Sequence, residues 1–327
     1  MHYIQRNMLL LIVLCVTILG ITAASRISNE SLTKPTIAVD SNTSLVDQGN
    51  ADRDNSSGIY TGNDISAPTE ASKVVQPQVM INKDGISALA YIAANVETGE
   101  IYVERNSSEV LPVASMSKLV TAFAATDILA ASTSITISKF AADVPPDGSG
   151  IREGETYTLD EILYPLLLDS SNIAAEALSS STTKRSKFLE LMSSYAWEIG
   201  MSSAYFADPS GVSSHNAASA FDLLALAKYL YKFRPDILAL TRTYMYEVST
   251  TTEHDSHTFV STHPFVNDVN FIGGKTGRTP EAGDTMLTIM NVGGNPVAII
   301  VLGSNYNTRA IDTRKILDTV TRMIKTQ

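Results

Sequence analysis

Strand-forming segments lie near residue 90 and again near residue 290, and helix-forming segments occupy most of the chain between them. The apolar stretches 88–96 and 101–103 flank Glu97-Thr98-Gly99, a pattern that predicts a β-hairpin. Two further apolar stretches, 285–292 and 297–302, flank a glycine-rich turn. Strands contributed by both ends of a chain, with helices between them, indicate an α+β fold. We expect an antiparallel sheet built from both termini, flanked by helices, with a helical lobe.

The helices are predicted from apolar residues that recur every three to four positions. Ser219, with Asp222 three residues later, has the spacing of a helix N-cap followed by an acidic first turn. The predicted helical segments are 117–130, 159–178, 186–199, 221–232 and about 309–324.

The N-terminus has the composition of an export signal. Arg6 precedes an apolar run from Met8 to Ala24, which is followed by Ser25 and Arg26. A basic head, an apolar core and small residues at its end predict a secretory signal peptide in residues 1–24. The run is also just long enough for an N-terminal membrane anchor, so cleavage and anchoring both remain open. In either case we expect the protein to be exported.

Residues 25–84 are rich in Ser, Thr, Asn, Asp and Gly and show no apolar periodicity. Such a segment cannot bury enough apolar surface to offset the entropy of ordering it, so we predict a flexible linker. Residues 85–327 remain, enough for one domain with two lobes.

Charge and cysteine content exclude several classes of function. The chain has 24 Lys+Arg against 34 Asp+Glu, a net charge of −10, and no basic cluster, so nucleic acid is not expected as a partner. Its single cysteine, Cys15, lies inside the apolar N-terminal run. An intramolecular disulfide, a cysteine-based zinc site and an iron–sulfur cluster are therefore excluded.

The first chemical motif is Ser115-Met116-Ser117-Lys118, of the form S-x-x-K. Residues three apart share one face of a helix, so the Lys118 amine can reach the Ser115 hydroxyl. Residues 31–34 and 181–184 have the same form, so the motif alone is not specific. Only Ser115 opens an apolar helix, and a helix N-terminus favours a developing negative charge.

Two more motifs follow. Ser170-Ser171-Asn172 fits S-x-N and stands between an apolar run and an apolar helix. Lys275-Thr276-Gly277 precedes the late strands. A cation, a hydroxyl and a residue without a side chain along a strand edge suit the docking of a carboxylate and a peptide. Taken singly, the first motif is better explained as a helix-capping serine and the second as a buried turn, and the third fits a glycine-rich turn equally well.

Taken together and in this order, S-x-x-K, S-x-N and K-T-G are the signature of penicillin-binding proteins and serine β-lactamases. The chain resembles the low-molecular-weight penicillin-binding proteins of the D-alanyl-D-alanine carboxypeptidase type, peptidase family S11. The resemblance covers about 85–327 and implies a β-lactamase/DD-peptidase-like catalytic domain. The stretches that support it are PVASMSK (112–118), LDSSN (168–172), DPSGV (208–212), SAFDL (219–223) and GKTGRT (274–279).

The resemblance also implies a mechanism. Ser115 attacks the carbonyl between the two terminal D-alanines of a peptidoglycan stem peptide and forms an acyl-enzyme. Lys118 accepts its proton, which requires burial and a neighbouring cation, Lys275, to lower the pKa of Lys118. Ser170 relays a proton to the leaving amine, and Asn172 holds the substrate amide or Lys118.

The remaining implied contacts hold the substrate. The N–H groups of Ser115 and Arg278 form the oxyanion hole, and Lys275, Thr276 and Thr279 hold the terminal carboxylate beside Gly277. No cofactor is implied. The resemblance implies that β-lactam antibiotics are covalent inhibitors. It also implies that the protein lies at the extracytoplasmic face of the bacterial membrane or in the cell wall.

The chain departs from the family pattern at the end of the last strand. Many members carry a carboxylate-binding arginine there, whereas this chain has Asn305, with Arg278 and Arg309 as candidates to replace it. The family's second β-rich domain and C-terminal anchor are not expected, so membrane attachment would fall to the N-terminal run.

Several alternatives stay open. Relatives without the extra domain include DD-endopeptidases that cleave cross-links. A serine β-lactamase is disfavoured because no E-x-x-L-N segment follows S-x-N and because Ser171 stands where those enzymes usually have aspartate. A non-catalytic penicillin-sensing module is disfavoured by three intact motifs. The spacing of His254, His257 and His263 is compatible with a metal site, but we expect these histidines to be surface or turn residues without a metal.

Overall fold

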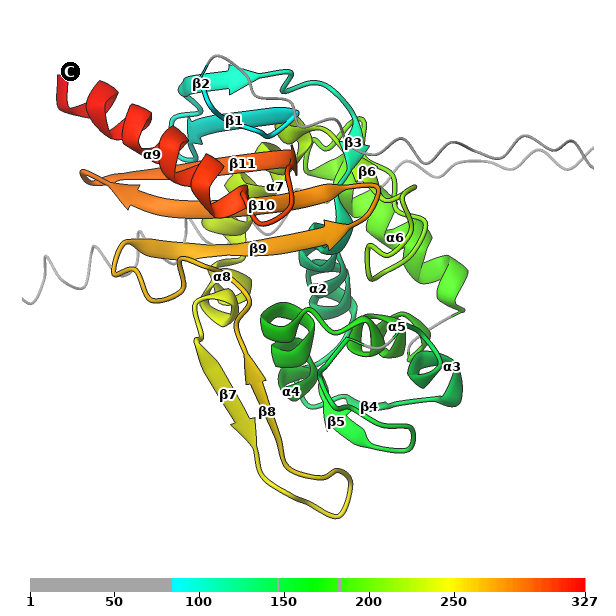
Figure 1. The fold of residues 1–327 in the computed structure, drawn as a ribbon. Coiled ribbons are helices and arrows are strands. Elements are labelled where there is room, and N and C mark those ends of the chain that lie inside the picture. The colour runs from blue at the N-terminus through cyan, green and yellow to red at the C-terminus, as the bar shows by residue number, and fades with distance from the viewer. Residues whose placement is uncertain (1–83, 146, 182–183, 327) are drawn as a thin grey trace, which may run out of the picture. The chain divides into compact units, whose positions relative to one another are not determined.

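The computed structural model describes residues 84–145, 147–181 and 184–326. The predictions for residues 1–24, and for 25–84 apart from Asp84, lie outside these residues. The central feature is a five-stranded sheet in the order β2-β1-β11-β10-β9, all of whose neighbours are antiparallel (Figure 1). Its strands are β1 (Ala90–Asn95), β2 (Ile101–Arg105), β9 (Phe271–Thr279), β10 (Gly283–Val292) and β11 (Asn295–Ser304).

This sheet confirms the predicted joining of the two ends of the chain. β1 pairs with β11 through a register that sets Tyr91 opposite Val301 and Ala93 opposite Ile299. Both predicted hairpins, β1–β2 and β10–β11, are present. β1 has five apolar side chains, which alternate between the two faces of the sheet. Because both faces are covered, all residues of β1 are buried and the strand shows no apolar–polar alternation.

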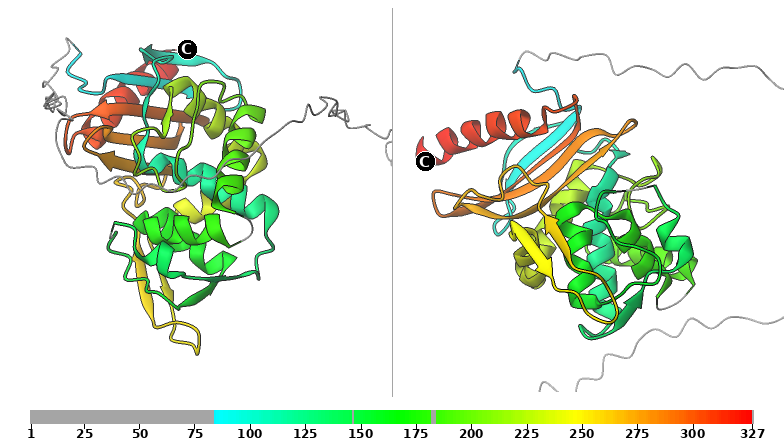
Figure 2. Two further views of the ribbon diagram at one scale, coloured as in Figure 1. Left: turned by 90° about the vertical axis from the view of Figure 1, so that its right-hand side faces the viewer. Right: turned by 60° about the horizontal axis from the view of Figure 1, so that its bottom comes forward.

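Helices cover both faces of the sheet. α9 (Arg309–Thr326) packs on one face over Met286, Val301 and their neighbours, while α7 (Ala220–Phe233) and α2 (Ser117–Ile128) lie on the other (Figure 2). The N-cap predicted before α7 is confirmed, because Ser219 Oγ accepts a hydrogen bond from the Asp222 N–H and the Asp222 carboxylate accepts one from the Ser219 N–H.

The helical lobe surrounds α2 below the sheet (Figure 1). Three short two-stranded ladders lie outside the five-stranded sheet. Among the described residues, no helix is both apolar enough and long enough to cross a membrane. The remaining elements are β3 (Leu111–Pro112), the 3₁₀ helix η1 (Ala114–Met116), β4 (Ser134–Thr136), α3 (Lys139–Ala142), β5 (Thr156–Thr158), α6 (Arg185–Glu198), β6 (Ala217–Ala218), α8 (Pro235–Thr241), β7 (Met245–Val248) and β8 (His257–Val260).

The prediction of one helix over 159–178 is wrong. The segment divides into α4 (Leu159–Tyr164), a single π-helical stretch η2 (Pro165–Asp169) and α5 (Asn172–Ser180). The helix breaks because Ser170 has a left-handed backbone with φ of 65° and Ser171 is extended before capping α5 through its hydroxyl. The break places the Ser-Ser-Asn motif at the junction of two helices.

Candidate active site

The three motifs meet in one cleft of about 290 Å³ beside the free edge of β9. The motifs come from the start of α2, the junction before α5, and β9. Residues from outside the motifs also line the cleft. The lining comprises Ser115, Asp147, Asp169, Ser170, Asn172, Thr262, Thr276, Gly277, Arg278 and Arg309.

The Ser115 hydroxyl and the Lys118 amine face each other across one helical turn. Lys118 Nζ lies 2.9 Å from Ser115 Oγ, 2.8 Å from Asn172 Oδ1 and 2.6 Å from the carbonyl oxygen of Ser210. The Lys118 side chain is completely buried. Burial lowers its pKa to about 7, against the opposing effect of the carboxylates of Asp147, Asp208 and Glu176. At neutral pH a substantial fraction of Lys118 is therefore uncharged and able to accept a proton.

The position of Ser115 depends on an unusual backbone before it. Ala114 is left-handed, with φ of 50°. Its carbonyl packs against Gly211, where φ is 85° and where a Cβ would collide with that carbonyl. The Asp208 carboxylate fixes the loop around Gly211 by accepting hydrogen bonds from the N–H groups of Ser210 at 2.7 Å and Gly211 at 2.6 Å. The same loop presents the Ser210 carbonyl to Lys118.

The second motif is clamped by a carboxylate that sequence reasoning missed. Asp147 accepts hydrogen bonds from Ser171 Oγ at 2.8 Å, from the Ile173 N–H at 3.0 Å and from the Asn172 N–H. Burial acts to raise the pKa of Asp147, but these bonds and those from Ser149 outweigh it and hold the pKa below its usual value. Asp147 lies in the Pro- and Gly-rich segment 145–150, where the sequence pattern indicates only a turn.

Lys275 joins the second motif to the third. Its Nζ lies 2.9 Å from Ser170 Oγ and 3.0 Å from the carbonyl oxygen of Thr276. Burial, followed by the charge of Lys118, holds the pKa of Lys275 well below its usual value. A neighbouring cation was predicted to lower the pKa of Lys118. Instead, burial lowers the pKa of Lys118, and the charge of Lys118 contributes to lowering the pKa of Lys275.

The backbone of β9 supplies the second face of the cleft. The Gly274 N–H donates to Thr241 Oγ1 and the Thr276 carbonyl accepts from Lys275, so both point away from β10. Backbone groups alternate along a strand, which puts the Arg278 N–H on the same free edge. Gly277 lies against η1: a Cβ there would be 2.9 Å from the Ser115 nitrogen. This arrangement brings the two predicted oxyanion donors to one end of the cleft.

The structure does not bring every predicted residue into the cleft. Among the described residues, Thr279 is not part of its lining, and the Thr279 hydroxyl instead accepts a hydrogen bond from the Ala282 N–H at the turn before β10. Arg278 lines the cleft, but its guanidinium is ion-paired with the buried Asp284.

The histidines are structural. His254 and His263 lie in connections between strands, within the expectation of surface or turn residues, and both are buried there. His254 stacks on Tyr157, and His257 Nε2 lies 2.9 Å from Glu155 Oε1. Burial lowers the pKa of His263 to about 3, so this ring is neutral. Within the described ranges, no group of three or more His, Cys, Asp or Glu side chains is arranged to hold a metal.

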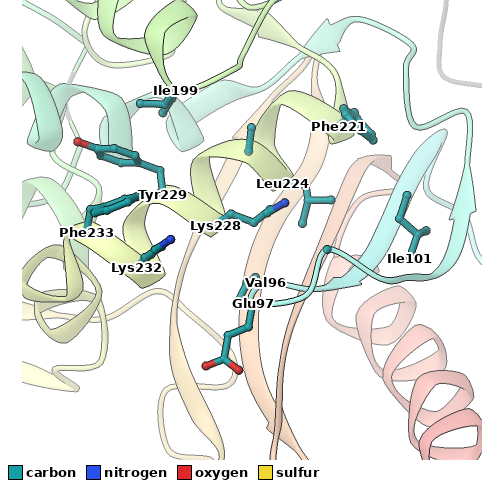
Figure 3. A pocket seen from close by; sticks show the side chains of 12 residues that line it. Val96, Glu97, Ile101, Ile199, Phe221, Leu224, Lys228, Tyr229, Lys232 and Phe233 are labelled. Atoms are coloured by element: carbon teal, nitrogen blue, oxygen red, sulfur yellow. The ribbon is translucent and has the colours of Figure 1, made fainter.

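A larger hollow of about 460 Å³ lies between the β1–β2 turn and α7 (Figure 3). Most of the residues that line it are apolar, including Leu224 and Phe233, and the side chains of Lys228 and Lys232 also line it. As far as the described residues go, its lining contains none of the motif residues. The chemistry therefore belongs to the smaller cleft.

Comparison with known proteins agrees with this geometry. Residues 76–306 match the family model of D-alanyl-D-alanine carboxypeptidase, Peptidase S11. The D-alanyl-D-alanine endopeptidase of Pseudomonas aeruginosa is 27% identical over 260 residues, which cover 75% of this chain and 78% of that protein. The D-alanyl-D-alanine carboxypeptidase DacF of Bacillus subtilis is 28% identical over 263 residues, covering 74% of this chain and 66% of the relative.

A solved structure extends the likeness to three dimensions. Penicillin-binding protein D2 of Listeria monocytogenes, in its cefotaxime-bound form, superposes with a TM-score of 0.63 at 28% identity, covering 72% of this chain and 97% of the other. The predicted β-lactamase/DD-peptidase-like fold is thereby confirmed. With a family model that matches most of its length and the family's three motifs gathered in one cleft, the chain belongs to the D-alanyl-D-alanine carboxypeptidase family, Peptidase S11.

Proposed function

We propose that this protein is a serine-type D-alanyl-D-alanine carboxypeptidase that acts on peptidoglycan stem peptides through an acyl-enzyme on Ser115. The observation that carries the proposal is the 2.9 Å contact between Ser115 Oγ and the Nζ of Lys118, whose pKa is lowered to about 7. A serine beside an amine that is partly neutral at physiological pH is an activated nucleophile.

Acylation follows from the positions of these groups. Ser115 Oγ attacks the carbonyl carbon of the penultimate D-alanine while its proton moves to Lys118 Nζ. The resulting oxyanion is bound by the N–H groups of Ser115 and Arg278, a contact that contributes about 3–4 kcal/mol per donor. When the C–N bond breaks, the Ser170 hydroxyl passes a proton to the leaving nitrogen and is resupplied from Lys275, 2.9 Å away. A water molecule then attacks the ester carbonyl and gives a proton to Lys275, while Lys118 returns its proton to Ser115 Oγ and the shortened peptide leaves as the acid.

A second candidate activity is cleavage of peptidoglycan cross-links, because the Pseudomonas relative is named an endopeptidase. The same chemistry serves both reactions, since each breaks an amide that follows a D-alanine. They differ in the size of the leaving group, so turnover of a monomeric pentapeptide against a cross-linked dimer separates them. Release of free D-alanine at the higher kcat/KM supports the carboxypeptidase.

We further propose that β-lactams acylate Ser115 and that the protein works outside the cytoplasm, at the face of the membrane or in the cell wall. The first part rests on the family and its penicillin-binding members. The second rests on the apolar run that begins at Met8 and on the substrate, which lies outside the cell. Signal cleavage and anchoring are both compatible with it.

The test of the nucleophile is labelling with a fluorescent penicillin followed by peptide mapping. The adduct is expected on Ser115, and Ser115→Ala abolishes it. Ser181→Ala is the matched control, because Ser181 opens another S-x-x-K sequence, lies outside the cleft and is expected to leave labelling unchanged. An adduct mapped to another serine, or undiminished labelling of Ser115→Ala, overturns the proposal.

A further inference from the structure

Two carboxylates are part of the described lining of the cleft, and the protein itself uses one of them fully. Asp147 Oδ1 accepts hydrogen bonds from the N–H and the hydroxyl of Ser149, at 3.0 and 2.7 Å. Its Oδ2 accepts from Ser171 Oγ at 2.8 Å, from the Ile173 N–H at 3.0 Å and from the Asn172 N–H. A carboxylate has about four lone-pair positions, so Asp147 has no capacity left for a ligand.

Asp169 is placed differently. Its Oδ1 accepts a hydrogen bond from the Val260 N–H at 2.7 Å. Among the described residues, none donates a hydrogen bond to Oδ2 and none forms an ion pair with this carboxylate. Burial raises the pKa of Asp169 above its usual value, and the Val260 hydrogen bond and the charge of Lys275 offset this effect only in part. The cleft therefore contains a half-buried carboxylate with one oxygen open to a ligand.

The position of Asp169 in the chain sets the side of the cleft on which this carboxylate lies. Asp169 directly precedes Ser170, the residue proposed to pass a proton to the leaving nitrogen, and Ser170 Oγ lies 2.9 Å from Lys275 Nζ. Consecutive Cα atoms are only about 3.8 Å apart. The Asp169 carboxylate is therefore close to the leaving group and not to the part of the peptide that stays on Ser115.

Hydrogen bonds to the segment after β8 hold this carboxylate in place. Besides the bond from Val260 to Asp169, the Thr262 N–H donates to the Leu168 carbonyl at 3.1 Å. The Thr262 hydroxyl also lies 3.0 Å from Thr276 Oγ1, in the third motif. The end of η2 is thus tied to a wall that contacts β9. A carboxylate held in this way is preorganised, so a ligand pays little to order it.

We infer that Asp169 is a specificity-determining residue that binds a cationic group on the leaving side, so that the protein favours peptides whose terminal D-amino acid has a basic side chain. This inference rests on the proposed function. The leaving D-amino acid carries its side chain on the carbon next to the nitrogen that Ser170 protonates. An ammonium at the end of a lysine-length chain can donate to the free Oδ2 of Asp169, whereas a second carboxylate there is repelled.

The experiment compares three peptides that end in D-Ala-D-Lys, D-Ala-D-norleucine and D-Ala-D-Glu, whose last side chains differ in charge. We expect the wild-type kcat/KM to be highest for the D-Lys peptide and lowest for the D-Glu peptide. Asp169→Asn removes the charge but keeps an oxygen that accepts from the Val260 N–H.

This variant should lower kcat/KM for the D-Lys peptide by about 5- to 30-fold, between the effects of an exposed ion pair and of a buried charge-assisted hydrogen bond. It should raise the value for the D-Glu peptide and change that for the D-norleucine peptide by less than about threefold. Asp160→Asn is the matched control, because Asp160 is exposed on α4 and is not among the described residues that line the cleft.

Three results would overturn the role of Asp169. The first is equal wild-type kcat/KM for the D-Lys and D-norleucine peptides, or an unchanged ratio of the two in Asp169→Asn. The second is an equal loss on all three peptides in the variant, which indicates a structural role. The third is cleavage of a D-Ala-D-Ala peptide with none of the three, because the leaving side then admits no longer side chain. All three leave the proposed function standing, whereas failure of the wild-type protein to form any Ser115 adduct with penicillin overturns the function itself.

Discussion

Gly277 lies so close to Ser115 that a Cβ at residue 277 would come within 2.9 Å of the Ser115 amide nitrogen. The same Cβ would lie 2.5 Å from Thr285 Oγ1, which itself donates to the Val113 carbonyl. The glycine of the third motif therefore lets β9 approach Ser115, the proposed nucleophile, from the side. The predicted oxyanion hole depends on that approach.

Gly277→Ala is expected to separate β9 from η1 and to slow acylation by a β-lactam by about 10²- to 10³-fold, the effect of losing one oxyanion donor. Overpacking should lower the free energy of unfolding by about 1–3 kcal/mol. The second-order acylation rate and a thermal unfolding curve measure the two effects. Gly294→Ala is the control for the acylation rate, because a Cβ there meets no atom within 4 Å; its φ of 87° strains alanine, so its unfolding curve is not compared. Acylation of Gly277→Ala within threefold of wild type would contradict the packing argument.

The acylation rate should rise with pH around neutrality. Because burial brings the pKa of Lys118 down to about 7, the amine is protonated and inactive well below that pH and neutral above it. We expect a sigmoidal increase in kcat/KM with a midpoint near pH 7. Lys118→Arg keeps a proton at every accessible pH and should lose about 10²- to 10⁴-fold. A rate that stays flat between pH 6 and pH 8 would count against Lys118 as the base.

Asp147→Asn tests the clamp on the second motif. The Asp147 carboxylate raises the pKa of Lys118, so its removal should move the midpoint of the pH profile to lower pH. The weakened hydrogen bonds to Ser171 and Ile173 should also lower the free energy of unfolding by about 1–3 kcal/mol. The exposed Asp143, paired with Lys139, provides the control variant Asp143→Asn. A midpoint that does not move refutes the electrostatic part of this role.

The ion pair between Glu176 and Arg185 is expected to contribute to stability. The Glu176 side chain is 5% exposed, and its two oxygens receive Nε at 2.8 Å and Nη2 at 2.9 Å from Arg185. Arg185→Met leaves a buried carboxylate unpaired and should lower the free energy of unfolding by about 2–4 kcal/mol. Lys187→Met breaks an exposed pair with Glu190 and should change it by less than about 1 kcal/mol. Urea denaturation of both variants distinguishes the cases, and equal effects would contradict the assigned burial.

Local sequence patterns predicted most elements of the fold. The strands near residues 90 and 290 and the helices from Arg185, Ala220 and Arg309 all form, because periodicity, turn glycines and caps act over a few residues. The break within 159–178 was not predicted, because the apolar residues of this segment keep helical spacing across it. Pro165 and the left-handed Ser170 redirect the chain there to meet Lys275.

The sequence by itself determined the motifs, their order and the family, because each motif is a short set of residues whose chemistry requires that spacing. Only the tertiary structure decided which other groups join them. Asp147 and Arg309 line the cleft from a connection and from a helix start, and Asp208 holds the loop that presents the Ser210 carbonyl to Lys118. The same holds for the lowered pKa of Lys118: burial and electrostatic effects depend on every neighbour packed around a group, and those neighbours come from across the chain.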